Sequence, residues 1–95
     1  MDEKIDILMA TYNGEKYIEE QINSILSQTY SNFRLVICDD CSTDNTYKLL
    51  KKIASDDDRI VIYKNEKNLG YIKNFEKLLG RVESEYFMLS DQDDI

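Results

Sequence analysis

Apolar residues follow two alternating patterns along the chain, which predict strands and helices in turn. Short apolar runs cover residues 5–10, 35–38, 60–63 and 86–89, and each has the length of a buried strand. Between them, apolar side chains recur at helical spacing, which indicates helices with one buried face. These helical stripes consist of Ile18, Ile22, Ile25 and Leu26, of Tyr47, Leu50, Ile53 and Ala54, and of Ile72, Phe75, Leu78 and Leu79. The expected element order is βαβαβαβ.

Strands that alternate with helices are typical of a parallel sheet with right-handed crossovers. We therefore expect an α/β fold, a Rossmann-like three-layer sandwich with a mainly parallel sheet, as one domain over residues 1–95. Ligands of such sheets bind beyond the carboxyl ends of the strands. Polar segments follow the first, second and fourth strands at residues 11–14, 39–45 and 90–94. We expect these three segments to lie along one edge of the sheet.

The composition excludes several functional classes for this chain. The chain has 19 acidic and 12 basic residues, a formal net charge of −7, no His, three Gly and two Cys. Without His, this chain alone cannot build Ser-His-Asp hydrolysis or His-based zinc sites. Three scattered glycines do not make the Rossmann or P-loop phosphate fingerprints. The excess of acid argues against a nucleic-acid partner, because phosphate backbones are bound by clustered Lys and Arg.

The cysteines and the apolar runs indicate in which cellular compartment the protein is expected. The apolar runs are far shorter than the roughly 20 residues that span a bilayer, and no signal peptide precedes them. With two Cys, a reducing cytoplasmic location is the expectation. Cys38 and Cys41 have redox or half-zinc spacing, but neither a second pair nor a His accompanies them, so we expect Cys38 to pack in the core.

Three groups of polar or aromatic residues are candidates for chemistry, and each has a plainer alternative. Carboxylates at residues 91, 93 and 94 follow a strand directly, which suits Mg²⁺ or Mn²⁺, although a solvated acidic turn has the same pattern. Asp39 and Asp40 follow another strand and could accept an N–H of a nucleobase, while residues 43–45 read as helix N-caps. Tyr12 could stack on a base or cover the sheet edge.

Taken together, these segments resemble glycosyltransferase family 2, whose members have the GT-A fold. The resemblance is carried by residues 7–30 (ILMATYNGEKYIEEQINSILSQTY), 33–46 (FRLVICDDCSTDNT), 65–79 (NEKNLGYIKNFEKLL) and 85–94 (EYFMLSDQDD). It covers essentially the whole chain, in order. The form of the last segment resembles bacterial rhamnosyltransferase-like members that build surface polysaccharide.

The resemblance implies a site for a nucleotide-sugar donor. In the first motif, Ala10, Thr11 and Tyr12 would border the nucleotide, with the Tyr12 ring against the base. In the second, Asp40 would accept the N3–H of a pyrimidine, with Asp39 as the alternative. The remaining implied site residues are Glu15 in the same pocket, Asn68 and Gly70 of an N-x-G loop, Lys73 and Asn74 beside it, and Asp91, Asp93 and Asp94 of a D-x-D motif for the ribose and the metal.

The resemblance also implies a reaction: inverting transfer of a sugar from a UDP- or dTDP-linked donor to a carbohydrate or lipid-linked acceptor, with Mg²⁺ or Mn²⁺. Because the acceptor half and the catalytic base of the family follow the D-x-D motif, we expect the base beyond Ile95 and no complete transfer by residues 1–95. An uncovered fourth strand would favour homo-oligomers through the sheet edge. The full-length protein could act at the inner face of the membrane.

Two other functions fit parts of the pattern. A non-enzymatic Mg²⁺-binding α/β module of the receiver type would use the acidic pair Asp39 and Asp40, but no Asp ends the third strand and no Lys follows the fourth. A sugar nucleotidyltransferase would need an early phosphate loop rich in Gly and Arg, which is missing.

Overall fold

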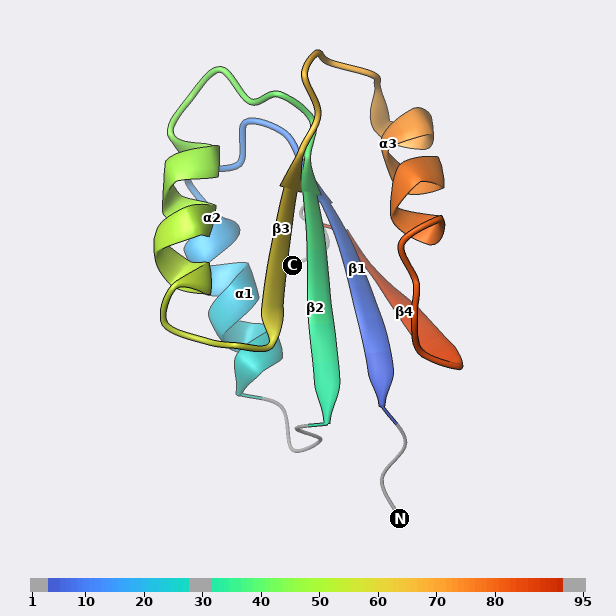
Figure 1. Ribbon diagram of the computed structural model, residues 1–95. Coiled ribbons are helices and arrows are strands. Elements are labelled where there is room, and N and C mark those ends of the chain that lie inside the picture. Colours follow the sequence, from blue (N-terminus) through green and yellow to red (C-terminus); the bar gives the residue numbers. More distant parts are fainter. Residues whose placement is uncertain (1–3, 28–31, 92–95) are drawn as a thin grey trace.

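The structure is a computed structural model that describes residues 4–27 and 32–91, with only the backbone of residue 91 (Figure 1). Its strands are β1 (Ile5–Thr11), β2 (Phe33–Asp39), β3 (Ile60–Lys64) and β4 (Tyr86–Asp91), and its helices are α1 (Ile18–Leu26), α2 (Thr46–Ala54) and α3 (Tyr71–Leu79). The predicted βαβαβαβ order is confirmed, and the strand and helix ends differ from prediction by at most two residues.

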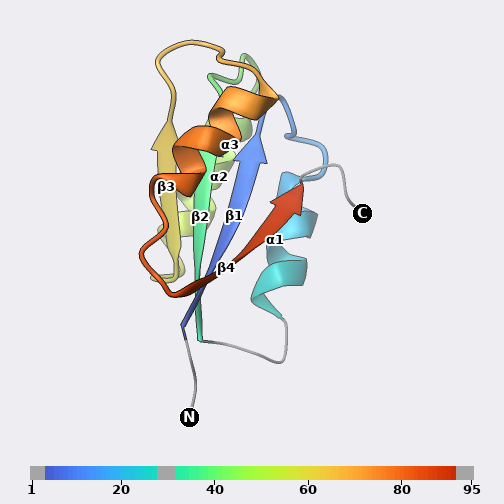
Figure 2. The same ribbon diagram turned by 90° about the vertical axis from the view of Figure 1, so that its right-hand side faces the viewer.

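The sheet is parallel throughout, with strand order β3-β2-β1-β4. β1 is central: Ile7 is in register with Leu35 of β2 on one side and with Met88 of β4 on the other. The chain adds strands outward from β1 to β3 and then returns to place β4 on the opposite side of β1. The arrowheads of β1, β3 and β4 point toward one edge in Figure 2, which we call the carboxyl edge. Ligands of α/β sheets bind beyond this edge, next to such a reversal of strand order.

Helices cover both faces of the sheet, so the three-layer prediction is confirmed (Figures 1 and 2). Alternate residues of β1 enter two separate cores because side chains of a strand point to opposite faces. Ile7 and Met9 pack in the core under α1 and α2, whereas Leu8 and Ala10 pack in the core under α3. No helix among the described residues has the length and apolar character needed to cross a membrane.

β4 is an edge strand with apolar side chains exposed on both faces. Tyr86, Phe87, Met88 and Leu89 are between 47% and 61% exposed. Leu89 is in register with Leu8, whose side chain faces α3, so Leu89 and Phe87 lie on the α3 side of the sheet. The other two, Tyr86 and Met88, lie on the α1 side. Among the described residues, neither a further strand nor a helix covers this apolar strand.

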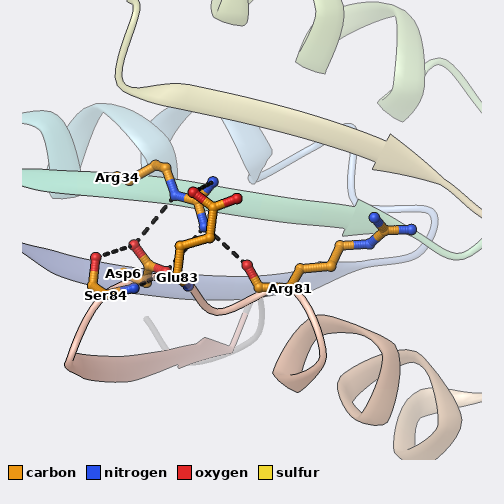
Figure 3. Close-up of polar contacts among 5 residues, drawn as sticks. All are labelled: Asp6, Arg34, Arg81, Glu83 and Ser84. Atoms are coloured by element: carbon orange, nitrogen blue, oxygen red, sulfur yellow. Dashed lines mark hydrogen bonds and ion pairs between the residues drawn. The ribbon is translucent and has the colours of Figure 1, made fainter.

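A buried carboxylate lies within the first apolar run. The Asp6 side chain has no exposed surface, and it accepts hydrogen bonds from Arg34, from the Ser84 hydroxyl and from the backbone N–H groups of Glu83 and Ser84 (Figure 3). Arg34 also donates to the carbonyl of Arg81. Burial by itself would raise the pKa of Asp6, but these hydrogen bonds outweigh it and hold the pKa well below its ordinary value. The network attaches the segment before β4 to β1 and β2.

Candidate functional site

The carboxyl edge brings together the segments that follow β1, β2 and β3 and the end of β4. Thr11 is in register with Asp39, Asp39 with Lys64, and Ala10 with Asp91. The expectation that the segments after the first, second and fourth strands share one edge is confirmed as far as residue 91. Asp93 and Asp94 lie outside the described residues. The structure adds a fourth segment, residues 65–70 after β3, which we call the 65–70 loop.

Asp39, the last residue of β2, joins the ends of the two central strands. Its side chain is fully buried, and Oδ1 accepts hydrogen bonds from the Thr11 hydroxyl at 2.8 Å and from the Ser42 hydroxyl at 2.6 Å. Oδ2 accepts the Ser42 N–H at 2.9 Å. The chain therefore uses this carboxylate to shape the turn that follows β2.

Asn13 attaches the segment after β1 to the segment after β2. Its backbone is in the left-handed region with φ 50°, a conformation that Asn tolerates better than most residues. Its Oδ1 accepts the N–H groups of Thr43 at 2.8 Å and Asp44 at 3.4 Å, and its own N–H donates to the Ser42 hydroxyl at 2.9 Å. The exposed Tyr12 therefore stands at a fixed position on this edge.

Of the three expected helix caps, Asp44 is the one whose side chain satisfies the start of α2. Its Oδ1 accepts both the N–H and the hydroxyl of Thr46, while Asn45, at the N-cap position, makes no side-chain cap bond. Burial by itself would raise the pKa of Asp44, but the hydrogen bonds from Thr46 and the Glu15 N–H lower it.

Glu15, in the segment between β1 and α1, contacts the start of α2. Its Oε1 accepts the Asn45 N–H at 3.3 Å. A cavity of about 420 Å³ beside it is lined by Asn13, Glu15, Lys16, Tyr17 and Asp44. Neither Asp39 nor Asp40 lines this cavity.

Asp40 connects the end of β2 to the 65–70 loop. Its side chain is only 3% exposed. Oδ1 accepts the Asn65 amide at 2.9 Å and the Leu69 N–H at 2.8 Å, and Oδ2 accepts the Gly70 N–H at 2.9 Å. The Asp40 carbonyl also accepts the Asn68 amide at 3.4 Å. One carboxylate thus fixes both ends of the loop.

Two buried asparagines extend this network into the core below. The Asn65 amide donates to Asn74 Oδ1 at 2.9 Å, and the Asn74 amide donates to the Cys38 carbonyl at 2.9 Å. The Cys38 thiol donates to Asn65 Oδ1 at 3.4 Å. Cys38 is buried, as predicted, and burial raises its pKa. Sequence reasoning missed Asn65; its position directly after a strand is the signal that could have identified it.

The implied residues of the N-x-G loop gather at the start of α3. Gly70 precedes the helix with φ 93°, and a β-carbon there would meet no atom within 4 Å, so the requirement for Gly is conformational. Lys73 is exposed in the first turn, and Asn74 is buried against β2. The structure therefore brings Asp40, Asn68, Gly70 and Asn74 together.

The described residues contain no group of three or more His, Cys, Asp or Glu side chains placed to hold a metal ion. The acids at residues 93 and 94, and the side chain of Asp91, are outside that search. The backbone at Asp91, in register with Ala10, lies at the carboxyl edge. Carboxylate oxygens are among the hard ligands that Mg²⁺ and Mn²⁺ prefer.

Two solved structures that contain nucleotide sugars have the same fold as this chain. Residues 1–349 of Staphylococcus aureus TarS, solved with UDP-GlcNAc, superpose with a TM-score of 0.86 at 33% identity, over 95% of this chain and 26% of that one. The mannosyltransferase PcManGT from Pyrobaculum calidifontis, solved with GDP-Man and Mn²⁺, gives 0.86 at 22% identity, over 94% and 27%. The α/β, GT-A prediction is confirmed.

Curated relatives of this chain are named as glycosyltransferases. An uncharacterized glycosyltransferase of Haemophilus influenzae is 41% identical over 96% of this chain. The Escherichia coli protein WfaP, a UDP-Glc:α-D-GlcNAc-diphosphoundecaprenol β-1,3-glucosyltransferase, is 37% identical over 97% of it. The chain spans 28% and 36% of the lengths of these two relatives. The family model for glycosyl transferase family 2 matches residues 6–95. The chain belongs to glycosyl transferase family 2, as its motifs predict.

Proposed function

We propose that this chain forms the donor site of an inverting glycosyltransferase that uses a UDP- or dTDP-linked sugar in cell-surface polysaccharide synthesis. The observation that carries the proposal is the meeting of the 11–14, 39–45 and 65–70 segments with the end of β4 at one edge of the sheet. TarS, which is 33% identical, was solved with UDP-GlcNAc, and WfaP is named for a UDP-Glc donor. Both support a uridine nucleotide as the first ligand to test.

In this proposal each part of the edge has a role toward the donor. Ala10 and Thr11 border the nucleotide, and the exposed ring of Tyr12 lies against the base. The contact with the pyrimidine belongs to the aspartate pair that ends β2, and Asp91 faces the ribose. The remaining proposed donor-site residues are Glu15, Asn68, Gly70, Lys73 and Asn74.

We assign a divalent cation, Mg²⁺ or Mn²⁺, to the carboxylates of Asp91, Asp93 and Asp94. Carboxylate oxygens suit either ion. When bound, the ion neutralises the negative charge that grows on a departing diphosphate. A bound cation explains how a chain with a net charge of −7 would bind an anionic donor.

The acceptor and the catalytic base belong, in this proposal, to a longer protein. WfaP is named for a lipid-linked acceptor, and this chain spans 36% of its length. No residue of this chain is proposed as the base. The acceptor would be a carbohydrate or a lipid-linked molecule, and a lipid-linked acceptor would place the parent enzyme in the cytoplasm at the inner face of the membrane.

Amide NMR of the ¹⁵N-labelled chain tests the proposal by locating the ligand. UDP with Mg²⁺ should shift the amides of Tyr12, Cys41 and Gly70 at the carboxyl edge and leave those of Arg34 and Ser84 at the opposite edge unchanged. ADP carries the same diphosphate on a purine base, so it controls for shifts that come from the diphosphate alone. Shifts confined to the edge near Arg34, or none with UDP and dTDP, would contradict the proposal.

A further inference from the structure

The lysines of α2 form an exposed basic surface on a chain that is acidic as a whole. Lys48, Lys51 and Lys52 are exposed, and α2 contains no acidic residue, although the whole chain has a net charge of −7. Lys64, the last residue of β3, is also exposed. Its Nζ lies 4.6 Å from the centre of the Tyr47 ring, and Lys51 Nζ lies 5.7 Å from the same centre. We call these four lysines the α2 lysine patch.

The acids of this chain do not neutralise the patch. Among the described residues, the ion pairs are formed by Arg34 and Arg59, and none includes a lysine. Asp44, just before α2, accepts hydrogen bonds at the start of that helix. An acidic run at residues 56–58 follows the helix, and its central carboxylate pairs with Arg59. The positive charge of the patch is therefore left for a partner outside the described residues.

Local helix energetics explain only part of the patch. The helix dipole favours cations in the last turn, which accounts for Lys51 and Lys52. Lys48 lies in the first turn, where the dipole disfavours a cation, and it is four residues from Lys52, a spacing at which like charges repel. Lys64 contacts Tyr47, which also lies in the first turn. Departures from local preference of this kind are expected at functional surfaces.

The side chains of the patch suit lipid headgroups better than a protein surface. Protein–protein interfaces are enriched in Arg and depleted in Lys. A guanidinium fits carboxylates of fixed geometry, whereas an ammonium on a flexible stem is a point charge. Clusters of at least four lysines suit the diffuse negative charge of anionic lipids. We propose that the α2 lysine patch docks this protein on a membrane surface that contains anionic lipids, with or without a bound nucleotide.

The patch reaches the carboxyl edge of the sheet. In Figure 1, α2 forms the outer left side of the molecule, and it packs against α1 and β3. Lys64 ends β3 in register with Asp39, and α2 begins at the same edge because Thr46 Oγ1 accepts the Gly14 N–H at 2.8 Å. A membrane on the patch would therefore lie next to the proposed donor site. The link to a lipid-linked acceptor rests on the proposed function, whereas the docking itself does not.

Co-sedimentation of the 95-residue chain with lipid vesicles, without nucleotide, tests the proposal. Vesicles of phosphatidylcholine with phosphatidylglycerol should bind the chain, and vesicles of phosphatidylcholine alone should not. Each lysine near an anionic surface is worth about fivefold in affinity, so Lys48→Glu with Lys52→Glu should weaken binding by at least about tenfold. High salt should also weaken wild-type binding, because it screens exposed charges.

The helix α3 supplies a matched control. Lys73 and Lys77 are also exposed and four residues apart, but Glu76 lies between them, and α3 covers the other face of the sheet (Figure 1). Lys73→Glu with Lys77→Glu changes the net charge by the same amount as the α2 double variant. Charges farther than a Debye length from the membrane are screened, so vesicle binding should stay within about twofold of wild type.

Several results would overturn the proposal. These are failure to bind the anionic vesicles, equal binding to both vesicle types, wild-type binding by the α2 double variant, or a loss confined to the α3 variant. Binding of poly-glutamate without binding of vesicles would instead identify an acidic protein as the partner. Should the α2 double variant not fold by circular dichroism, Lys48→Gln with Lys64→Gln removes charge without reversing it and should weaken binding in the same direction.

Titration with UDP in Mg²⁺ separates this inference from the proposed function. The α2 double variant should keep wild-type UDP affinity, because none of its changed residues belongs to the proposed donor site. A wild-type chain that binds anionic vesicles but neither UDP nor dTDP would refute the proposed function and leave the docking surface in place. A chain that binds UDP but not the vesicles would do the reverse.

Discussion

Asp6 and Arg34 form a two-point ion pair across the central strands, at the edge of the sheet opposite to the proposed donor site. Arg34 Nε lies 3.2 Å from Asp6 Oδ1 and Arg34 Nη2 lies 3.0 Å from Asp6 Oδ2 (Figure 3). Two parallel bonds of this kind fix orientation as well as distance. Because Asp6 also holds the segment before β4, the pair helps to place the strand that ends at Asp91.

Asp6→Ala should therefore be among the most destabilising single changes in this chain. It leaves the largely buried Arg34 without its partner and the Glu83 and Ser84 N–H groups without an acceptor. We expect a loss of about 3–5 kcal/mol in the free energy of unfolding, measured by urea denaturation. Glu83→Gln is the control, because its carboxylate is 76% exposed and its contact with Arg34 should contribute under about 1 kcal/mol. Equal effects of the two changes would contradict this assignment.

The same pair predicts a dependence of stability on pH. The pKa of Asp6 lies well below its ordinary value of 3.8 in the folded chain, so the unfolded chain binds the proton first as the pH falls. The contribution of Asp6 is therefore complete above about pH 5 and is lost progressively below about pH 4. Asp6→Asn should flatten the fall in the free energy of unfolding on acidification. A residual slope is expected from Asp44 and Asp57, whose pKa values are also lowered. Identical slopes for variant and wild type would refute the prediction.

Asn13 allows the effects of backbone strain and of hydrogen bonding to be separated. Asn13→Gly keeps the φ of 50° accessible but removes the side-chain acceptor for the Thr43 and Asp44 N–H groups, which should cost about 1 kcal/mol. Asn13→Ala removes the acceptor and adds strain, and should cost about 1 kcal/mol more. Urea denaturation of both variants measures the difference. If Ala were tolerated as well as Gly, the left-handed conformation would not be a constraint.

The apolar edge strand β4 predicts self-association of the 95-residue chain. Exposed edges with apolar side chains favour pairing with another chain, and Lys on such an edge opposes it. Sedimentation velocity at micromolar concentrations should show oligomers that Leu89→Lys converts to monomer. Ile72→Lys, on the exposed surface of α3, controls for nonspecific association through exposed apolar side chains and should leave the oligomers in place. A monodisperse wild-type monomer would count against the prediction.

Much of the fold is predictable because local periodicity agrees with the packing. The helical stripe from Ile18 to Leu26 and the apolar runs of β1 and β2 are buried where the spacing places them. The resemblance to a known family supplied the proposed donor-site residues, and the parallel strand order explains why those among the described residues lie near one edge of the sheet.

The buried polar contacts could not be predicted from spacing. Asp6 lies inside an apolar run, and its partners Arg34 and Ser84 are distant in sequence, so nothing local indicates a buried carboxylate. Asn65 and Asn74 are polar residues whose burial depends on how α3 lies on the sheet. For the same reason, Asp40 looks from sequence like an open acceptor, whereas its oxygens are bound to the loop before α3.

Calorimetric titration of UDP in Mn²⁺ and in EDTA shows whether a divalent cation completes the proposed donor site. We expect binding in Mn²⁺ and at least tenfold weaker binding, about 1.4 kcal/mol, in EDTA. Asp93→Ala should abolish this metal dependence, and Asp58→Ala, which changes an exposed acid before β3, should preserve it. Equal UDP affinity in Mn²⁺ and EDTA, or a metal dependence that survives Asp93→Ala, would contradict a cation-completed site.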